Sequence, residues 1–243
     1  MNRARPRLSW VWILVLPFFA LGRPSGSDVP ESLKANLDLP YDATAESQEE
    51  EDAPEVILLY GGAYEATAVV FCLDESRSMA KNDRWDLQKK EATRAIQELT
   101  DRVEFGLVFY GQDAYAFRPT LMAATPANKQ AAIAFIASRQ MTSGTCLGKG
   151  AVKSLQMLQN ARSKHRAVIL AGDGRPTSCP FVPGQDRNPQ ILSATFAETI
   201  AANPGLQIRL HSIYVGSQPI PEDVEFLKTL ASIHGGTFRT ASK

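Results

Sequence analysis

The sequence predicts an α/β fold: a doubly wound, mostly parallel central sheet with helices on both faces and one antiparallel edge strand. Two segments, AVVFCL at 68–73 and RAVILA at 166–171, are apolar almost throughout, which is typical of strands buried on both faces. Between them, residues 84–100 repeat apolar side chains at the spacing of one helical face. Strands that alternate with helices in this way indicate a parallel sheet covered on both sides.

The remaining segments continue the alternation. VEFGLVFY at 103–110 is a predicted strand, and DAYAFRP at 113–119 is predicted to pair antiparallel with it across a short turn. Thr125 and Pro126 suit a helix N-cap and the first helical position. The other elements are helices at 126–138, 147–158, 189–202 and 221–234, and strands at 207–215 and 237–240. EVILLYGG at 55–62 adds a strand or a hairpin whose place in the fold stays open.

The N-terminus has the pattern of an export signal. Three arginines precede the apolar run WVWILVLPFFAL at 10–21, and ALG at 20–22 places small residues where a signal peptidase cleaves. The run is shorter than the roughly 20 apolar residues that a spanning helix needs. We therefore expect a signal peptide at 1–22 and a secreted, periplasmic or cell-envelope protein. An uncleaved membrane anchor is the alternative.

The next segment, 23–54, is rich in Pro, Ser, Asp and Glu and poor in β-branched and aromatic residues. Such a composition cannot bury enough apolar surface to offset the loss of conformational entropy on folding. We expect a disordered acidic linker there, followed by a single domain at 55–243.

Composition and motifs exclude several classes of function. Basic and acidic residues both number 26, so the chain carries no overall charge that would favour nucleic acid. SGTCLGKG at 143–150 lacks both ends of the phosphate-loop pattern, which argues against nucleotide binding. The three histidines show no short zinc-ligand spacing.

Oxygen-bearing side chains follow the two apolar strands. Asp74 comes directly after the first strand, with Ser76 and Ser78 at alternate positions, and Asp173 follows the second. Thr145 lies in a loop just before a predicted helix. In open α/β sheets, sites form beyond the carboxyl ends of strands where the strand order reverses. If the two strands are neighbours at that point, both carboxylates face one crevice.

Three segments carry a resemblance to a known family. DESRS at 74–78, SGTCL at 143–147 and ILAGDG at 169–174 occur in the order of the metal-ion-dependent adhesion site of von Willebrand factor type A domains. The resemblance covers about residues 66–242. Carried over, it implies a metal site formed by Asp74, Ser76, Ser78, Thr145 and Asp173.

Two positions depart from the family's pattern. Arg77 stands where many members have Gly, and Gly172 where many have Ser or Thr. Neither position supplies a ligand, so the site is expected to survive. Arg77 adds a positive charge near the face that would meet a partner, which favours acidic partners.

The donor set suits a hard cation. Mg²⁺ takes about six oxygens, and Mn²⁺ or Ca²⁺ accept similar donors. Two aspartates balance the charge of such an ion, while the hydroxyls add none. An open coordination position would still favour an anionic oxygen, such as an Asp or Glu of a partner protein. The sequence thus predicts an exported, metal-dependent adhesion or interaction domain and no enzyme.

Two other functions stay open. A hydrolase could use the same metal, although no general base is placed near Asp74 by the sequence and Ser76 lacks a nucleophile motif. The other alternative is a scaffold domain whose metal site is vestigial.

Export also bears on the three cysteines. Cys146 follows Thr145, and Cys179 lies shortly after Asp173, so converging metal loops would bring the two sulfurs together. We expect a Cys146–Cys179 disulfide, with Cys72 as a buried thiol.

Overall fold

The sheet is built around β3, in which every residue is buried. The computed structural model describes residues 53–179, 182 and 188–241, so the predicted signal peptide and nearly all of the predicted linker lie outside the described residues. In sheet order the strands are β5 (Ala114–Ala116), β4 (Glu104–Tyr110), β3 (Ala68–Asp74), β7 (Arg166–Gly172), β8 (Arg209–Val215) and β9 (Phe238–Ala241). The pairs from β4 to β9 are parallel, whereas β5 and the short β6 (Met122–Ala123) pair antiparallel with β4. The predicted fold class is confirmed.

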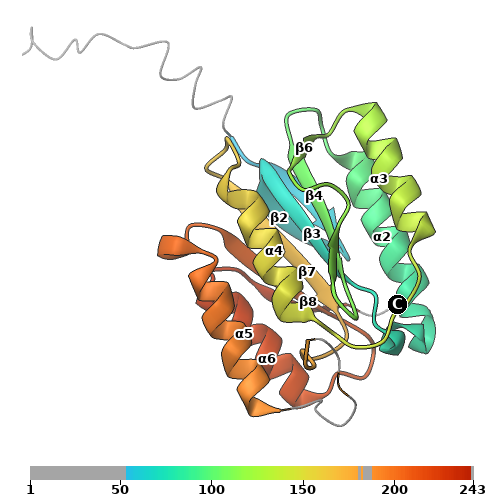
Figure 1. The fold of residues 1–243 in the computed structure, drawn as a ribbon. Coiled ribbons are helices and arrows are strands. Elements are labelled where there is room, and N and C mark those ends of the chain that lie inside the picture. The colour runs from blue at the N-terminus through green and yellow to red at the C-terminus, as the bar shows by residue number, and fades with distance from the viewer. Residues whose placement is uncertain (1–52, 180–181, 183–187, 242–243) are drawn as a thin grey trace, which may run out of the picture. The chain divides into compact units, whose positions relative to one another are not determined.

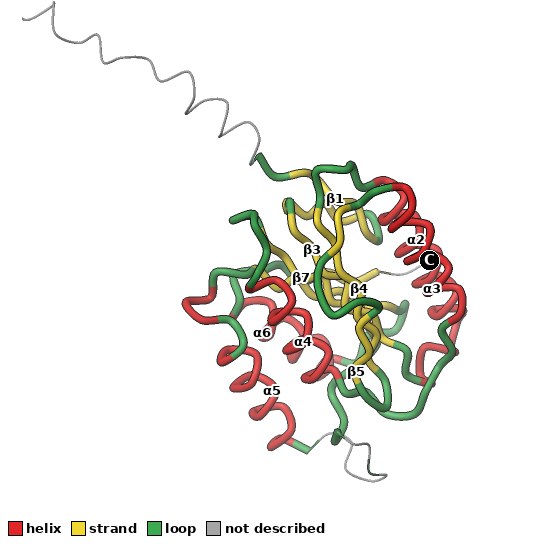
Figure 2. Tube along the Cα trace, turned by 45° about the horizontal axis from the view of Figure 1, so that its top comes forward, coloured by secondary structure: helices red, strands yellow, loops and turns green. Residues whose placement is uncertain are grey.

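Helices cover both faces of this sheet. The helices are α2 (Arg84–Glu98), α3 (Pro126–Ser138), α4 (Leu147–Gln159), α5 (Pro189–Ala201) and α6 (Pro221–Ile233), with 3₁₀ segments η2 (Arg77–Asp83) and η3 (Pro204–Leu206). α2 and α3 lie on one side of the strands, and α4, α5 and α6 on the other (Figure 1 and Figure 2). The part of the chain that the structure describes contains no helix with the length and apolarity needed to cross a membrane.

The alternation of side chains along β3 explains the two layers. Phe71 belongs to the apolar cluster that also contains Ile96 of α2. Cys72 points to the opposite face and joins the cluster that contains Leu155 of α4. Because successive side chains of a strand point to opposite faces, a strand covered on both sides must be apolar at every position. This is why AVVFCL shows no polar alternation.

The segment 55–62, whose place the sequence did not decide, forms the first strand and the turn of a hairpin. β1 (Glu55–Leu59) pairs antiparallel with β2 (Gly62–Ala66) in a separate two-stranded sheet. Tyr60 and Gly61 form the two-residue turn, both with positive φ, as expected of a type I′ hairpin. The inner face of the hairpin packs into the same apolar cluster as α2.

Two details of the predicted elements were wrong. The strand expected at 113–119 is limited to β5, because Pro119 has no N–H to extend the ladder and the chain bends from Phe117. The chain then returns to β4 as β6, which the sequence analysis did not include. By contrast, the expected cap of α3 is confirmed, since the side chain of Thr125 accepts a hydrogen bond from the N–H of Asn128.

A buried histidine gives the fold a predictable response to acid. His211 on β8 packs edge-on against Tyr64, with ring centroids 4.9 Å apart. Its Nδ1 accepts a hydrogen bond from the backbone N–H of Thr237 at 3.1 Å, so the proton of the neutral ring sits on Nε2. Burial, together with the charge of Arg209, lowers the pKa of His211 from 6.5 to about 4. Protonation would place a hydrogen on Nδ1 of His211, facing the backbone N–H of Thr237, and this hydrogen bond would be lost.

We therefore expect the folded protein to lose stability as the pH falls from 6.5 towards 4. In that window His211 becomes protonated in the unfolded state and stays neutral in the folded state. This difference lowers the free energy of unfolding by about 2–3 kcal/mol. Thermal unfolding of His211→Asn should show a shallower dependence on pH than wild type. His165→Asn, at a partly exposed histidine, is the matched control. Equal slopes for wild type and His211→Asn would contradict the prediction.

Candidate metal centre

The two acid-bearing strands are neighbours at the point where the strand order reverses. Leu73 of β3 lies opposite Ala171 of β7, so Asp74 and Asp173 leave the sheet side by side at its carboxyl edge. The chain runs from β3 to β4 on one side and later enters β7 on the other. This is the position at which open α/β sheets form crevices for ligands.

The loop after β3 folds its polar side chains towards Asp173. Asp74 Oδ1 accepts a hydrogen bond from the N–H of Ser76 at 2.7 Å, which closes the turn. The hydroxyls of Ser76 and Ser78 are 2.8 Å apart, and the Ser78 hydroxyl donates to Asp173 Oδ1 at 2.7 Å. The alternate spacing of the serines therefore puts the Ser78 hydroxyl on Asp173 and the Ser76 hydroxyl next to that of Ser78.

Thr145 reaches the same place through the loop before α4. Its N–H donates to the hydroxyl of Thr177 at 2.8 Å, and the N–H of Thr177 donates back to the carbonyl of Thr145 at 3.0 Å. One residue further on, Cys146 forms a disulfide with Cys179, with Cα atoms 5.3 Å apart. Thr145 and Asp173 line a cavity of about 230 Å³ whose walls also include Ser78, Arg175, Ile220 and Asp223.

One carboxylate oxygen at this site has no partner. Asp74 is fully buried, and its Oδ2 makes no hydrogen bond. Burial, reinforced by the charge of Asp173, raises the pKa of the Asp74 carboxyl well above its usual range. A buried and unpaired carboxylate is costly unless a cation or a donor compensates it. The oxygen is thus placed to bind a cation.

The donor set fits a hard divalent ion better than a transition metal. The described residues contain no cluster of three or more His, Cys, Asp or Glu side chains that could hold a metal. The candidate centre instead combines two carboxylates with three hydroxyls, and such oxygen donors suit Mg²⁺.

Residues 69–175 match the family model of the von Willebrand factor type A domain. Over this segment, which is less than half of the chain, the protein is similar to von Willebrand factor type A domains. Among solved structures, a type A domain protein from Catenulispora acidiphila gives a TM-score of 0.58 at 20% identity, covering 74% of this chain and 40% of that one. The PilB minor pilin from Streptococcus sanguinis gives 0.55 at 15% identity, covering 78% and 58%. At these identities the likeness is one of fold.

Curated relatives match over a longer stretch than the family model. Inter-alpha-trypsin inhibitor heavy chain H4 from Homo sapiens is 26% identical over 179 residues, which are 70% of this chain and 18% of that protein. A UPF0353 protein from Mycolicibacterium vanbaalenii is 28% identical over 195 residues, 72% of this chain and 55% of that one. The chain therefore spans about half or less of the length of these relatives.

Two residues of α2 contact the acids of the candidate centre, and the sequence analysis missed both. Arg84, the first residue of the helix, places Nη1 2.5 Å from Asp173 Oδ2. One turn later, Gln88 donates from Nε2 to the backbone carbonyl of Asp74 at 2.6 Å. The signal in the sequence was their spacing of four residues at the start of the helix that follows DESRS. That spacing puts both side chains on one helical face.

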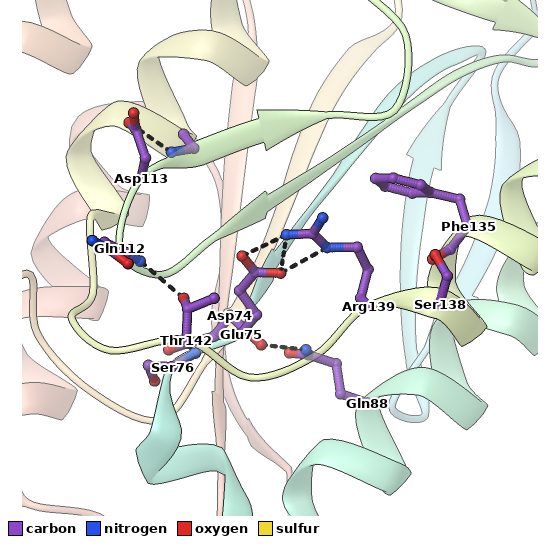
Figure 3. Close-up of polar contacts among 11 residues, drawn as sticks. Asp74, Glu75, Ser76, Gln88, Gln112, Asp113, Phe135, Ser138, Arg139 and Thr142 are labelled. Atoms are coloured by element: carbon purple, nitrogen blue, oxygen red, sulfur yellow. Dashed lines mark hydrogen bonds and ion pairs between the residues drawn. The ribbon is translucent and has the colours of Figure 1, made fainter.

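A buried ion pair fixes the back of the DESRS loop. The side chain of Glu75 is fully buried and accepts three hydrogen bonds from Arg139: Nη2 donates to both carboxylate oxygens at 2.7 Å, and Nε donates to Oε2 at 2.9 Å. Figure 3 shows these two groups face to face, with Thr142 beside the same loop. The N–H of Thr142 donates to the carbonyl of Glu75 at 2.7 Å. Glu75 is a positioning residue that joins the loop after β3 to the loop that carries Thr145.

The packing around position 172 explains why this chain has glycine there. A Cβ at this position would lie 2.3 Å from the hydroxyl oxygen of Tyr110 and 2.7 Å from Asp74 Oδ2. The Tyr110 hydroxyl is held by a hydrogen bond to the carbonyl of Ala171 at 3.0 Å. The Ser or Thr that many type A domains have is therefore incompatible with Tyr110 in this chain.

Gly172→Ser is expected to destabilise the protein by about 1–3 kcal/mol, because it overpacks the contact with Tyr110. Gly172→Ser combined with Tyr110→Phe removes the clashing hydroxyl and should recover part of the loss. Urea unfolding of the two single variants and the double variant measures the coupling between the positions. Additive effects of the two substitutions would show that the tyrosine hydroxyl is not what requires glycine.

Proposed function

We propose that this type A domain is an exported, divalent-metal-dependent protein-binding module in which a partner's carboxylate completes the coordination of the ion. The observation that carries the proposal is the unpaired Oδ2 of the buried Asp74, next to a second carboxylate and a set of converging hydroxyls. The residues that would hold the ion are Asp74, Ser76, Ser78, Thr145 and Asp173. The bound ion would supply a positive centre for an anionic oxygen.

Mg²⁺ is the proposed ion, with Mn²⁺ or Ca²⁺ as substitutes. Neutral hydroxyls and only two acids leave the ion electrophilic, so a further anionic ligand is favoured. The cavity of about 230 Å³ beside Ser78 and Asp173 has room for one side chain. An Asp or Glu side chain of a partner protein is of that size, and the bound ion would attract its charge.

A binding role agrees better with the surroundings of the site than hydrolysis does. No histidine is among the residues that line the described cavity. His211 and His234 lie in the protein interior, hydrogen-bonded to Thr237 and Asn203. A metal-assisted hydrolase would need a general base within hydrogen-bond reach of the attacking water, and a carboxylate can serve as well as a histidine. Asp223, the carboxylate of the cavity wall outside the proposed ligands, is engaged by Arg175, whose Nε lies 2.5 Å from its Oδ1.

The neighbours in fold include proteins that are named as surface structures. SpaC from Lactobacillus rhamnosus GG is described as a pilus adhesin and gives a TM-score of 0.58 at 16% identity. We propose a comparable setting here, in which the domain acts outside the cytoplasm after export. The predicted signal peptide supports this location.

The test compares partner capture by wild type and Asp74→Asn, each immobilised in Mg²⁺ or in chelator. A partner that depends on the ion is expected to stay bound only to wild type in Mg²⁺. Its exposed acids are then replaced one at a time, and a single Asp or Glu should account for the metal dependence. Truncating such a contact typically costs 2 kcal/mol or more. The proposal would be refuted by a partner whose affinity is unchanged in chelator, unchanged by Asp74→Asn, and unchanged when each of its own exposed acids is replaced.

A further inference from the structure

Arg84 places a fixed positive charge inside the candidate metal centre. Its side chain is 10% exposed, and that of Asp173 is 4% exposed, so the pair at 2.5 Å is largely shielded from water. The guanidinium also packs against the backbone where β8 ends. A Cβ at Gly216 would lie 2.7 Å from Nη2 of Arg84. The arginine is therefore confined beside Asp173.

The two oxygens of Asp173 already have internal donors. Ser78 donates to Oδ1 and Arg84 to Oδ2, whereas Oδ2 of Asp74 has no hydrogen-bond partner. In the ion-free protein, Arg84 thus neutralises Asp173 and leaves Asp74 uncompensated. An incoming ion gains the free oxygen of Asp74 but has to share Asp173 with an arginine.

Arg84 changes the charge balance expected from the sequence alone. Two aspartates would balance a divalent ion, but the arginine leaves the loaded centre with one excess positive charge. Like charges a few ångströms apart in a buried site repel strongly. A partner's carboxylate would restore neutrality, so ion and partner would strengthen each other's binding.

We propose that Arg84 is an internal counter-cation that weakens ion binding at this centre and makes tight binding of the ion depend on an acidic partner. The proposal rests on the proposed function, because it assumes that the ion binds at Asp74 and Asp173. Arg84 acts here through Asp173 and through its charge.

The first experiment measures the affinity for Mg²⁺ and Mn²⁺ alone, by calorimetry and by the electron paramagnetic resonance of bound Mn²⁺. Arg84→Gln is expected to lower the Kd for either ion by at least about tenfold, because the competing charge is gone. Arg84→Lys keeps the charge and should bind the ion as weakly as wild type. Arg94→Gln, at a more exposed arginine of the same helix, is the matched control and should change nothing.

A second measurement uses the unmodified residue and does not depend on whether Arg84→Gln folds. The ¹⁵Nε resonance of the Arg84 side chain in wild type is expected to shift on addition of Mg²⁺, whereas that of Arg94 stays in place. An Arg84 resonance that does not respond to a saturating ion would overturn the inference.

The outcomes separate this inference from the proposed function. If a folded Arg84→Gln binds the ion no more tightly than wild type, the counter-cation role is wrong and the metal site stands. If Arg84→Gln binds the ion and wild type does not, the counter-cation role is supported, and the proposed function then requires that wild type binds the ion once an acidic partner is present. If neither protein binds Mg²⁺ or Mn²⁺ at millimolar concentration, both proposals fail.

Discussion

Asp74→Asn is expected to abolish the stabilisation of the protein by Mg²⁺ and, at the same time, to make the ion-free protein more stable than wild type. The buried carboxylate has one oxygen without a partner and lies beside a second acid. Replacing it with a neutral amide of the same shape removes the cost of burying that charge, about 1–3 kcal/mol. The same replacement removes a ligand of the ion.

Thermal unfolding with and without Mg²⁺ measures both effects. At an ion concentration 100 times the Kd, mass action stabilises wild type by about 2.7 kcal/mol. For a domain of this size, that corresponds to a rise in Tm of roughly 5–10 °C. Asp74→Asn should start from a higher Tm in chelator and show no rise.

Asp86→Asn, at an exposed carboxyl on α2, is the matched control and should respond to Mg²⁺ as wild type does. An equal ion-induced rise in Asp74→Asn and in wild type would refute the metal centre. A lower Tm for the variant in chelator would show that Asp74 is satisfied in the ion-free fold.

Local patterns were enough to predict most of the fold. The apolar runs around Phe71 and Ile169 could only be strands covered on both sides. One helix start was marked by a residue whose side chain caps the chain locally, as Thr125 does by accepting from the N–H of Asn128. The position of the hairpin could not be predicted from the sequence, because it depends on contacts between residues far apart in sequence. One of them is the hydrogen bond from the Tyr60 N–H to Glu91 at 2.9 Å.

The candidate site shows the same division. The spacing of Asp74, Ser76 and Ser78 is a local property. Asp173 was expected beside them on the condition that their two strands are neighbours, and β3 and β7 do pair. Arg84 could not be placed in this way, since its partner lies 89 residues away and an arginine at a helix start is usually solvated. The sequence therefore indicated the oxygen donors, but not the charge that opposes the ion.

The Cys146–Cys179 disulfide joins the two loops on which the site depends. Thr145 precedes one cysteine, and the loop that follows Asp173 leads to the other. The bridge closes a loop with a sequence separation of 33 residues. In the chain-entropy model, a loop of this length is worth about 3–4 kcal/mol of stability.

Removing the bridge is expected to reduce both stability and ion affinity. Cys146→Ala combined with Cys179→Ala should lower the Tm of the ion-free protein by roughly 10 °C. The Kd for Mg²⁺ should rise as well, because the loops would then rely, among the described residues, on the hydrogen bonds between Thr145 and Thr177. Calorimetry on the double variant and wild type measures the change in Kd, and thermal unfolding the change in Tm.

Cys72 provides the internal control. It is buried in the core, and burial raises the pKa of its thiol to about 12, so it should neither react nor pair while the protein is folded. Cys72→Ala should keep the bridge and the ion affinity of wild type. Non-reducing peptide mapping of exported protein should recover one cross-linked peptide that contains Cys146 and Cys179, with only Cys72 alkylated after unfolding. If all three cysteines are alkylated instead, the loops are held by hydrogen bonds alone and the bridge has no part in ion binding.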